Sequence, residues 1–247
     1  MDFKESQTIK NLTRAFSAEC QDGAKYQYMA DEATAQQLSY VSTILKQLAT
    51  NEMAHAKVLY DYISQNCGEE DLYVDIKATV PMAHAPLEKM LCIKGTNEQR
   101  QAEVVYPAFI KVAQKEGFTD IAKKMEEIAK VEAVHAKILD KLYSGIKNNT
   151  LYQSNNSCCY KCFNCGYEQV TTKGWKKCPL CDKPQGYIKI NMHGANGNCG
   201  CGDEDCGCGD EDCGCKSAAK KTAPKAKAVA TKKTTSASKS KQSKKVK

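Results

Sequence analysis

The sequence predicts a mainly α-helical protein, in which a four-helix bundle is followed by a small cysteine-rich domain and a long tail. Four long stretches carry apolar residues at the spacing of one helix face. Within these stretches, a glutamate followed by Glu-x-x-His occurs twice, and the two copies lie about eighty residues apart. Two Cys-x-x-Cys pairs follow close together, which indicates a separate module built around the cysteines.

The helix boundaries follow from glycine, proline and the apolar pattern. Gly68 provides a stop after the second helix, and Gly117 provides one after the third. The connection over residues 68–85 contains Pro81 and is long for neighbouring helices, so we expect one long crossover along the bundle. Pro107 lies inside the third helix and should kink it. The expected helices cover residues 6–37, 39–65, 86–116 and 118–145.

The repeated glutamate–histidine pattern predicts a dinuclear metal site. Residues three apart share a helix face, so residues 52–55 and 132–135 each direct a carboxylate and an imidazole to one point. A further glutamate precedes each pair, by 33 residues in the first copy and 34 in the second. This donor set is that of ferritin-like bundles, and four buried carboxylates would be costly without cations. The six expected ligands are Glu19, Glu52, His55, Glu98, Glu132 and His135.

The four-cysteine module predicts a second metal site. Cys162-x-x-Cys165 and Cys178-x-x-Cys181 are the spacing of a tetrahedral four-thiolate site, which accepts iron or zinc. Cys159-x-x-Cys162 offers an alternative register. We favour the first register because Gly166 follows Cys165 and lets backbone N–H groups turn toward the sulfurs.

The charge of +7 describes the tail and not the body of the chain. Residues 216–247 carry twelve lysines and no acid, whereas residues 199–215 carry six acids among Cys-Gly repeats. The first 198 residues hold 24 basic and 23 acidic residues, so the net charge says little about what they bind. We expect no membrane partner, and no nucleic-acid partner beyond weak binding by the basic tail. The Cys-Gly repeats could bind soft metals, and the basic tail is expected to be disordered.

The expected units are a bundle (1–147), a linker (148–157), a four-cysteine domain (158–193), an acidic Cys-Gly segment (194–215) and a Lys/Ala-rich tail (216–247). Twelve of the fifteen cysteines fall after residue 157, and the N-terminus lacks an apolar signal region. We therefore expect a cytoplasmic, reducing location without a membrane span, where clustered cysteines bind metal instead of forming disulfides.

Residues 160–167 and 178–187 resemble a rubredoxin module. Together with the preceding bundle, residues 1–190 resemble the rubrerythrin family, and the runs Tyr106–Phe109 and Glu116–Phe118 fit it as well. The resemblance implies a homodimer that reduces hydrogen peroxide to water. Electrons would come from an external NAD(P)H-dependent reductase, through the four-cysteine iron, to two irons in the bundle, with zinc as a possible substitute.

The resemblance also implies individual roles. Glu52 and Glu132 would bridge the two irons, with Glu19 and His55 on one iron and Glu98 and His135 on the other. Tyr26 and Tyr106 would hydrogen-bond near the site as tentative catalytic residues. The family usually has another glutamate five residues before the Tyr-Pro pair, where this chain has Gln101, a possible weak ligand or neighbour of the ligands. Two other functions remain open: an iron-oxidising or iron-binding ferritin-like protein, and a metal-buffering protein led by residues 199–215.

Overall fold

The structure is a computed structural model that describes residues 2–66 and 72–190. The bundle consists of α1 (Gln7–Ala35), α2 (Ser39–Ser64), α3 (Leu87–Arg100), a π-helical segment η1 (Gln101–Val105), α4 (Tyr106–Glu116) and α5 (Thr119–Lys147). The small domain contains β1 (Gln153–Lys161), β2 (Glu168–Lys173) and a 3₁₀ turn η2 (Gln185–Tyr187). The mainly helical, ferritin-like fold predicted from the sequence is confirmed. Both tail segments and the Cys67-Gly68 stop lie outside the described residues.

One end of the bundle is closed by contacts between α1 and α4. Ser6 caps α1, because its hydroxyl accepts a hydrogen bond from the backbone N–H of Ile9 at 3.1 Å. Glu116, the last residue of α4, accepts from the backbone N–H of Thr8 at 2.8 Å, so its carboxylate lies at the positive end of α1. Gly117 follows with a φ of 90°, the left-handed conformation that ends helices and that glycine adopts without strain.

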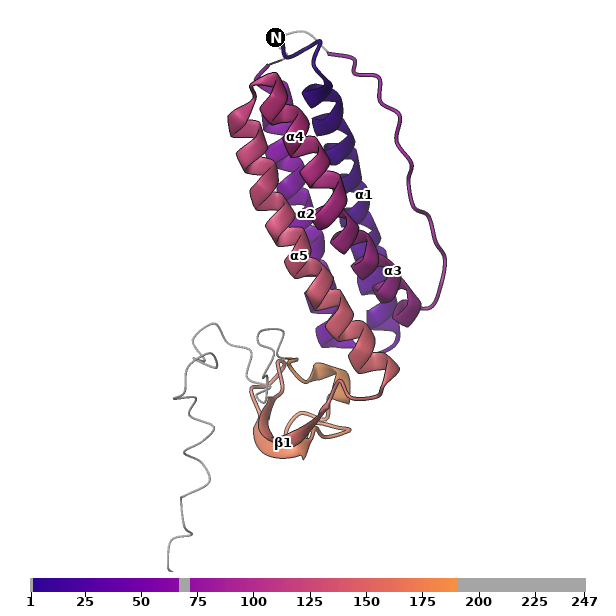
Figure 1. The fold of residues 1–247 in the computed structure, drawn as a ribbon. Helices are drawn as coiled ribbons and strands as arrows, with labels where there is room; N and C mark the ends of the chain where they lie inside the picture. The colour runs from indigo at the N-terminus through magenta and orange to yellow at the C-terminus, as the bar shows by residue number, and fades with distance from the viewer. Residues whose placement is uncertain (1, 67–71, 191–247) are drawn as a thin grey trace, which may run out of the picture.

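The connection to α3 runs the length of the bundle. Residues 72–86 form no regular structure and extend beside α1, from the end of α2 to the start of α3 at the opposite end (Figure 1). Arg14 of α1 donates to the carbonyl of Lys77 at 3.0 Å, and Leu72 and Val74 pack against the bundle core. This extended segment is the long crossover that the sequence predicted.

The third helix differs from its prediction. In place of one kinked helix, the structure has α3 and α4 joined by the π-helical residues Gln101–Val105. Pro107 lies in the first turn of α4, where it needs no N–H of its own. Its ring would clash with the carbonyl four residues earlier, that of Glu103, and a widened turn avoids this clash. The sequence predicted a kink in one helix but not this π-helical segment.

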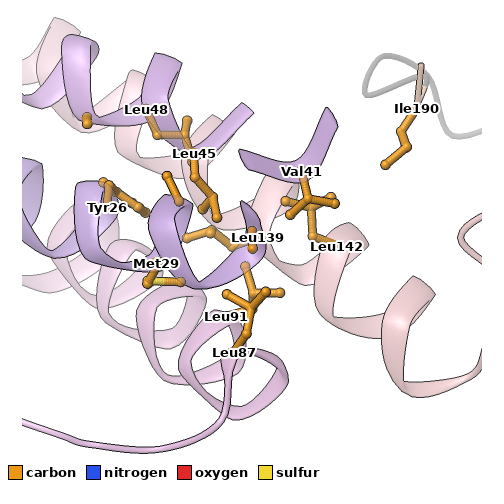
Figure 2. Packing of buried hydrophobic residues seen from close by; sticks show 13 residues of the cluster. Tyr26, Met29, Val41, Leu45, Leu48, Leu87, Leu91, Leu139, Leu142 and Ile190 are labelled. Atoms are coloured by element: carbon orange, nitrogen blue, oxygen red, sulfur yellow. The ribbon is translucent and has the colours of Figure 1, made fainter. Parts of the chain in front are cut away.

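Two apolar clusters fill the bundle, one toward each end. Figure 2 shows the cluster toward the small domain, with Tyr26, Leu45 and Leu139 from three helices. The other cluster contains Leu12, Leu59, Met125 and further residues. On α1, α2 and α5, the predicted metal ligands lie in sequence between the members of the two clusters, so the bundle places the ligands between two apolar layers.

The small domain packs against the base of the bundle. Gly186 lies so close to the start of α2 that a Cβ atom there would be 1.9 Å from the carbonyl oxygen of Gln37. Phe163, inside the first cysteine knuckle, lies between Tyr187, stacked at 4.9 Å, and Tyr40 of α2 at 5.5 Å. β1 already begins at Gln153, so the second half of the predicted linker 148–157 is strand.

The helices of the described part do not combine the length and the apolar composition that a membrane-spanning helix needs.

Candidate metal centres

The bundle brings the predicted glutamates and histidines to one place at mid-height. Glu19 comes from α1, Glu52 and His55 from α2, and Glu132 from α5, with ligand atoms that all lie within 4.8 Å of one another. Each is buried because it lies on the inward stripe of its helix, in register with the apolar residues above and below. The remaining two predicted ligands, Glu98 of α3 and His135 of α5, are buried beside this group.

Two of the glutamates each face both histidines. Glu52 places Oε2 3.2 Å from Nδ1 of His55 and Oε1 3.0 Å from Nδ1 of His135. Glu132 places Oε1 2.9 Å from Nδ1 of His55 and Oε2 3.4 Å from Nδ1 of His135. A carboxylate that directs one oxygen to each of two positions has the geometry to bridge two ions, so the arrangement fits the bridging role that the family resemblance implied.

Several buried ligand atoms lack hydrogen bonds in the described part of the chain. They are Glu19 Oε2, Glu52 Oε1, both carboxylate oxygens of Glu132, and His135 Nδ1. Buried polar atoms without hydrogen bonds are costly, and a group of them directed at one point is the environment that a cation stabilises. The donor set of four carboxylates and two imidazoles suits iron or manganese, so the residues present fit a dinuclear metal site.

The protonation of the cluster shows the same need for cations. Burial raises the pKa of Glu19 well above its ordinary value. Burial would lower the pKa of His55, but the close carboxylates of Glu132, Glu19 and Glu52 outweigh it and raise the pKa to about 12. The same competition raises the pKa of His135 to about 9. Without metal, the histidines therefore carry protons that stand in for the cations.

Each of the two tyrosines donates a hydrogen bond to a glutamate of another helix, one to Glu98 and the other to Glu19. The Tyr26 hydroxyl of α1 donates to Oε1 of Glu98 at 2.6 Å, and the Tyr106 hydroxyl of α4 donates to Oε1 of Glu19. Burial and the neighbouring carboxylates raise the pKa of both tyrosines well above its ordinary value, so both stay protonated donors. The structure thus places their hydroxyl groups against predicted ligands, while their rings belong to the two apolar clusters.

The surroundings of Glu98 include two residues that sequence reasoning missed. Lys94 lies one turn before Glu98 and is 1% exposed; its Nζ is 2.6 Å from Oε1 of Glu98 and 2.9 Å from Oδ1 of Asp22. Gln101 donates from Nε2 to Oδ2 of Asp22 at 3.0 Å and to Oε2 of Glu98 at 3.1 Å. A signal was available, because Asp22 lies three residues after Glu19 and Lys94 continues the inward stripe of Leu87 and Leu91. Glu103 points elsewhere, bonded to Gln99 at 3.2 Å.

The four predicted cysteines form the second cluster. Sγ of Cys162 lies 3.8 Å from that of Cys181, and Sγ of Cys165 lies 3.6 Å from that of Cys178. A tetrahedral site with metal–sulfur bonds of about 2.3 Å has sulfurs roughly 3.8 Å apart, whereas a disulfide joins them at about 2.05 Å. The sulfurs are therefore spaced for a metal ion.

Two matching turns place these sulfurs. The backbone N–H of Gly166 donates to the carbonyl of Cys162 at 2.8 Å, and that of Asp182 donates to the carbonyl of Cys178 at 3.0 Å. Both turn residues have positive φ, 76° and 60°, so the glycine after Cys165 has the conformational reason the sequence suggested. A hydrogen bond from the backbone N–H of Lys183 lowers the pKa of Cys181 to about 6, which favours the thiolate that binds metal. Cys159 stands outside this group, 4.0 Å from Glu168.

Comparisons with known proteins agree with this geometry. A family model described as Rubrerythrin matches residues 10–143 and 96–159. A rubrerythrin of Clostridium perfringens is 31% identical over 189 residues, which cover 76% of this chain and 95% of the relative. A rubrerythrin of Nitratidesulfovibrio vulgaris is 28% identical, again over 76% of this chain and 95% of the relative. A solved structure of nigerythrin in a partially reduced state has a TM-score of 0.50 at 24% identity and covers 75% of this chain and 90% of the solved one, which supports the fold.

Proposed function

The chain belongs to the rubrerythrin family, and from this premise we propose that it reduces hydrogen peroxide to water as part of a defence against oxidative stress. Two irons would be bound in the bundle by Glu19, Glu52, His55, Glu98, Glu132 and His135. A third iron would be bound by Cys162, Cys165, Cys178 and Cys181.

One observation carries the proposal: a carboxylate–histidine cluster and a four-thiolate cluster occur in the same chain. A protein that only stores or oxidises iron has no need of a dedicated one-electron site beside its bundle. A peroxide reductase does need such a site, because each turnover consumes two electrons that must be returned to the bundle. The proposed bundle (1–147) and four-cysteine unit (158–193) divide these two tasks.

The reaction balances as H₂O₂ + 2e⁻ + 2H⁺ → 2H₂O. Iron in the bundle would supply the redox chemistry that transfers the two electrons to the O–O bond. The protein residues would hold the ligands in place around the two metal positions. Glu52 and Glu132 hold the two positions together, and the apolar clusters on both sides limit water around them. The Tyr26 and Tyr106 hydroxyls donate to the carboxylates of Glu98 and Glu19 and hold them in place.

The electrons would enter through the four-cysteine site, supplied by an external NAD(P)H-dependent reductase. Two of its four cysteines are buried and two are partly exposed, so one side of the cluster faces solvent where a donor can approach. We propose that the working unit is a homodimer in which the cysteine site of one chain serves the bundle of its partner.

The test is anaerobic stopped-flow mixing of fully reduced protein, first with hydrogen peroxide and then with dioxygen. We expect peroxide to oxidise the bundle much faster than dioxygen does, with two electrons consumed per peroxide. Glu132→Ala should lose the bundle iron and this reaction, and should keep the red colour of the cysteine-bound iron. Faster oxidation by dioxygen, with iron released or mineralised, would instead identify a ferritin-like iron oxidase.

A further inference from the structure

The two halves of the dinuclear centre have different neighbours. The sequence repeat makes Glu19 and Glu98 equivalent, and each accepts a hydrogen bond from one tyrosine. Four residues before Glu19 stands Ala15, which is buried and apolar. Four residues before Glu98 stands Lys94, which is equally buried and carries a charge. The repeat thus provides an internal comparison in which one half has an ammonium group that the other lacks.

Lys94 is held against the centre by three groups. Its Nζ lies 2.6 Å from Glu98 Oε1, 2.9 Å from Asp22 Oδ1 and 4.8 Å from the centroid of the Tyr26 ring. Two carboxylates lie within ion-pair distance of Nζ, so Lys94 is held as a charged ammonium group although it is buried. Structural lysines are rarely buried so completely without a specific reason.

Lys94 and its neighbours occupy both oxygens of Glu98. Oε1 faces Tyr26 and Lys94, and Oε2 accepts from Gln101 at 3.1 Å. Glu19 is different, because only Oε1 accepts a hydrogen bond, while Oε2 accepts none and lies 3.4 Å from Nδ1 of His55. The Glu19 half of the centre therefore offers a carboxylate oxygen that can bind a cation. In the other half, the carboxylate of Glu98 is already paired with the ammonium group of Lys94.

We propose that Lys94, balanced by Asp22, makes the two metal positions inequivalent, so that metal binds first at the Glu19/His55 position and more weakly at the Glu98/His135 position. A metal ion that binds Glu98 must share the carboxylate with an ammonium group in a site of low dielectric, where like charges repel strongly. The first position meets no such charge. Lys94 and Asp22 are positioning residues here, because they act through Glu98.

Asp22 should act in the opposite direction to Lys94. Its carboxylate pairs with Lys94 and accepts a hydrogen bond from Gln101, so it offsets the ammonium charge near the second position. Removing Lys94 leaves a negative charge that favours the second metal, and removing Asp22 leaves a positive charge that opposes it. A general loss of stability would weaken metal binding in both variants, so the opposite signs separate the two explanations.

The inference rests on the proposed ligand assignment and not on peroxide turnover. The test uses the full chain titrated with Mn(II), a hard ion that prefers carboxylates and imidazoles to thiolates, so the cysteine clusters compete little. Free Mn(II) has a sharp paramagnetic resonance signal that is lost on binding, which gives the two dissociation constants. The variants are Lys94→Met, Lys94→Arg and Asp22→Asn, with Lys25→Met as matched control. Lys25 also approaches Asp22, at 3.4 Å, but is 18% exposed.

We expect two binding steps in the parent, at least tenfold apart. Lys94→Met should tighten the second step at least tenfold and leave the first nearly unchanged, Lys94→Arg should keep the parent ratio, and Asp22→Asn should weaken the second step. Lys25→Met should behave as the parent. Equal steps in the parent, or a ratio that Lys94→Met does not change, would overturn the inference.

Failure of the ligand assignment has a different signature. If Glu132→Ala still binds two Mn(II) ions as the parent does, the assignment itself is wrong and the inference fails with the proposed function. If Glu132→Ala loses both ions while Lys94→Met leaves the ratio unchanged, the assignment stands and only the role of Lys94 is lost. Circular dichroism of each variant without metal confirms that the helices are intact before the constants are compared.

Discussion

At the scale of single residues, the neutral side chain of Gln101 leaves the dinuclear centre with four carboxylates. Four carboxylates balance two divalent ions, whereas the family resemblance implies a fifth carboxylate at this position. The structure shows what the amide does instead: its Nε2 donates to both Asp22 and Glu98, which joins two acidic groups that would otherwise repel. A carboxylate could not make these two bonds. The family resemblance implies that the fifth carboxylate takes over one iron from the histidine when the site is oxidised. Because Gln101 is an amide and is bonded to Asp22 and Glu98, we expect the iron at the Glu19/His55 position to remain bound to His55 in both oxidation states.

Gln101→Glu should lower the reduction potential of the dinuclear centre. A fifth carboxylate near the irons stabilises the ferric state, because two unit charges ~4 Å apart interact by a few kcal/mol even at high effective dielectric. A shift of at least about 60 mV, a tenfold change for one electron, is expected. The measurement is redox titration of parent and variant at equal iron loading. The matched control is Gln99→Glu. The side chain of Gln99 is directed away from the centre and donates to the exposed Glu103, so this variant should leave the potential unchanged. An unchanged potential in Gln101→Glu would show that position 101 does not control the centre.

The protonation of the ligands predicts that metal loading releases protons. The nearby carboxylates of Glu132 and Glu52 raise the pKa of His135 to about 9, against the opposing effect of burial. His135 therefore holds a proton at pH 7 and must lose it to bind metal. Metal affinity should therefore rise as pH increases from 7 to 9, and proton release should fall over the same range. Calorimetry of Mn(II) binding in buffers of different ionisation enthalpy measures this release directly. Release that stays constant from pH 7 to 9 would contradict the assignment of His135 as a ligand.

The same pKa shifts affect the stability of the metal-free protein. A histidine whose folded pKa is raised above the unfolded value of about 6.5 contributes stability below that value and loses it as pH rises through the folded pKa. For His135 this window runs from about 6.5 to about 9. The metal-free bundle should thus become less stable over the range in which metal binds more tightly, so bound metal matters most at high pH.

At the scale of elements, the contact between η2 and α2 determines where the small domain sits. Gly186 approaches the carbonyl of Gln37 so closely that no side chain fits, and the aromatic contact of Phe163 with Tyr40 lies beside it. Because the obstacle is backbone, an added methyl group must push the domain away from the bundle. The position of the cysteine cluster relative to the bundle therefore depends on one glycine.

Gly186→Ala should slow reductase-driven peroxide turnover at least tenfold, because a displaced domain transfers electrons less well. It should leave unchanged the single-turnover reaction of chemically reduced protein with peroxide, since the bundle is not altered. Gly174→Ala is the control, because its methyl group would meet the Cδ1 atom of Ile188 within the same domain, at 2.6 Å. Visible absorption must first show intact cysteine-bound iron in both variants. Equal turnover in Gly186→Ala and parent would show that this contact does not hold the functional arrangement.

At the scale of the whole molecule, the proposal joins two metal centres into one electron path. The bundle centre lies between two apolar clusters, whereas the cysteine centre lies in the small domain at the end of the bundle (Figure 1). In this proposal each centre has its own task, so a variant that loses the cysteine centre should keep the chemistry of the bundle centre.

Cys162→Ser should abolish turnover with an external reductase, because one of the four clustered sulfurs is lost. The chemically reduced variant should still react with peroxide once, at the parent rate, since none of the bundle ligands has changed. Cys159→Ser is the control, a neighbouring buried cysteine outside the four-sulfur group. It should keep both the red colour and the turnover. Parent-like turnover in Cys162→Ser would refute the electron path.

The sequence by itself determined the elements of this protein whose cause is local. Helical spacing and the two Glu-x-x-His runs indicated four helices and the residues on their inward faces, because three-residue spacing fixes a shared face in any helix. The Cys-x-x-Cys spacing and the glycine after Cys165 likewise indicated the cysteine knuckles, since the turn needs only a few adjacent residues. An irregularity of the third helix near Pro107 was also predictable, as a kink, since it results from the proline ring itself.

Only the tertiary structure decided how residues from different helices meet. The exchange of partners, with Tyr26 on Glu98 and Tyr106 on Glu19, depends on how α1, α3 and α4 pack. The inward stripe of α3 indicates that Lys94 faces the core, but its buried pairing with Asp22 exists only because α3 lies against α1. The close approach of Gly186 to Gln37 has the same origin. Such contacts are set by side-chain volume and distance across helices, which helical periodicity does not encode.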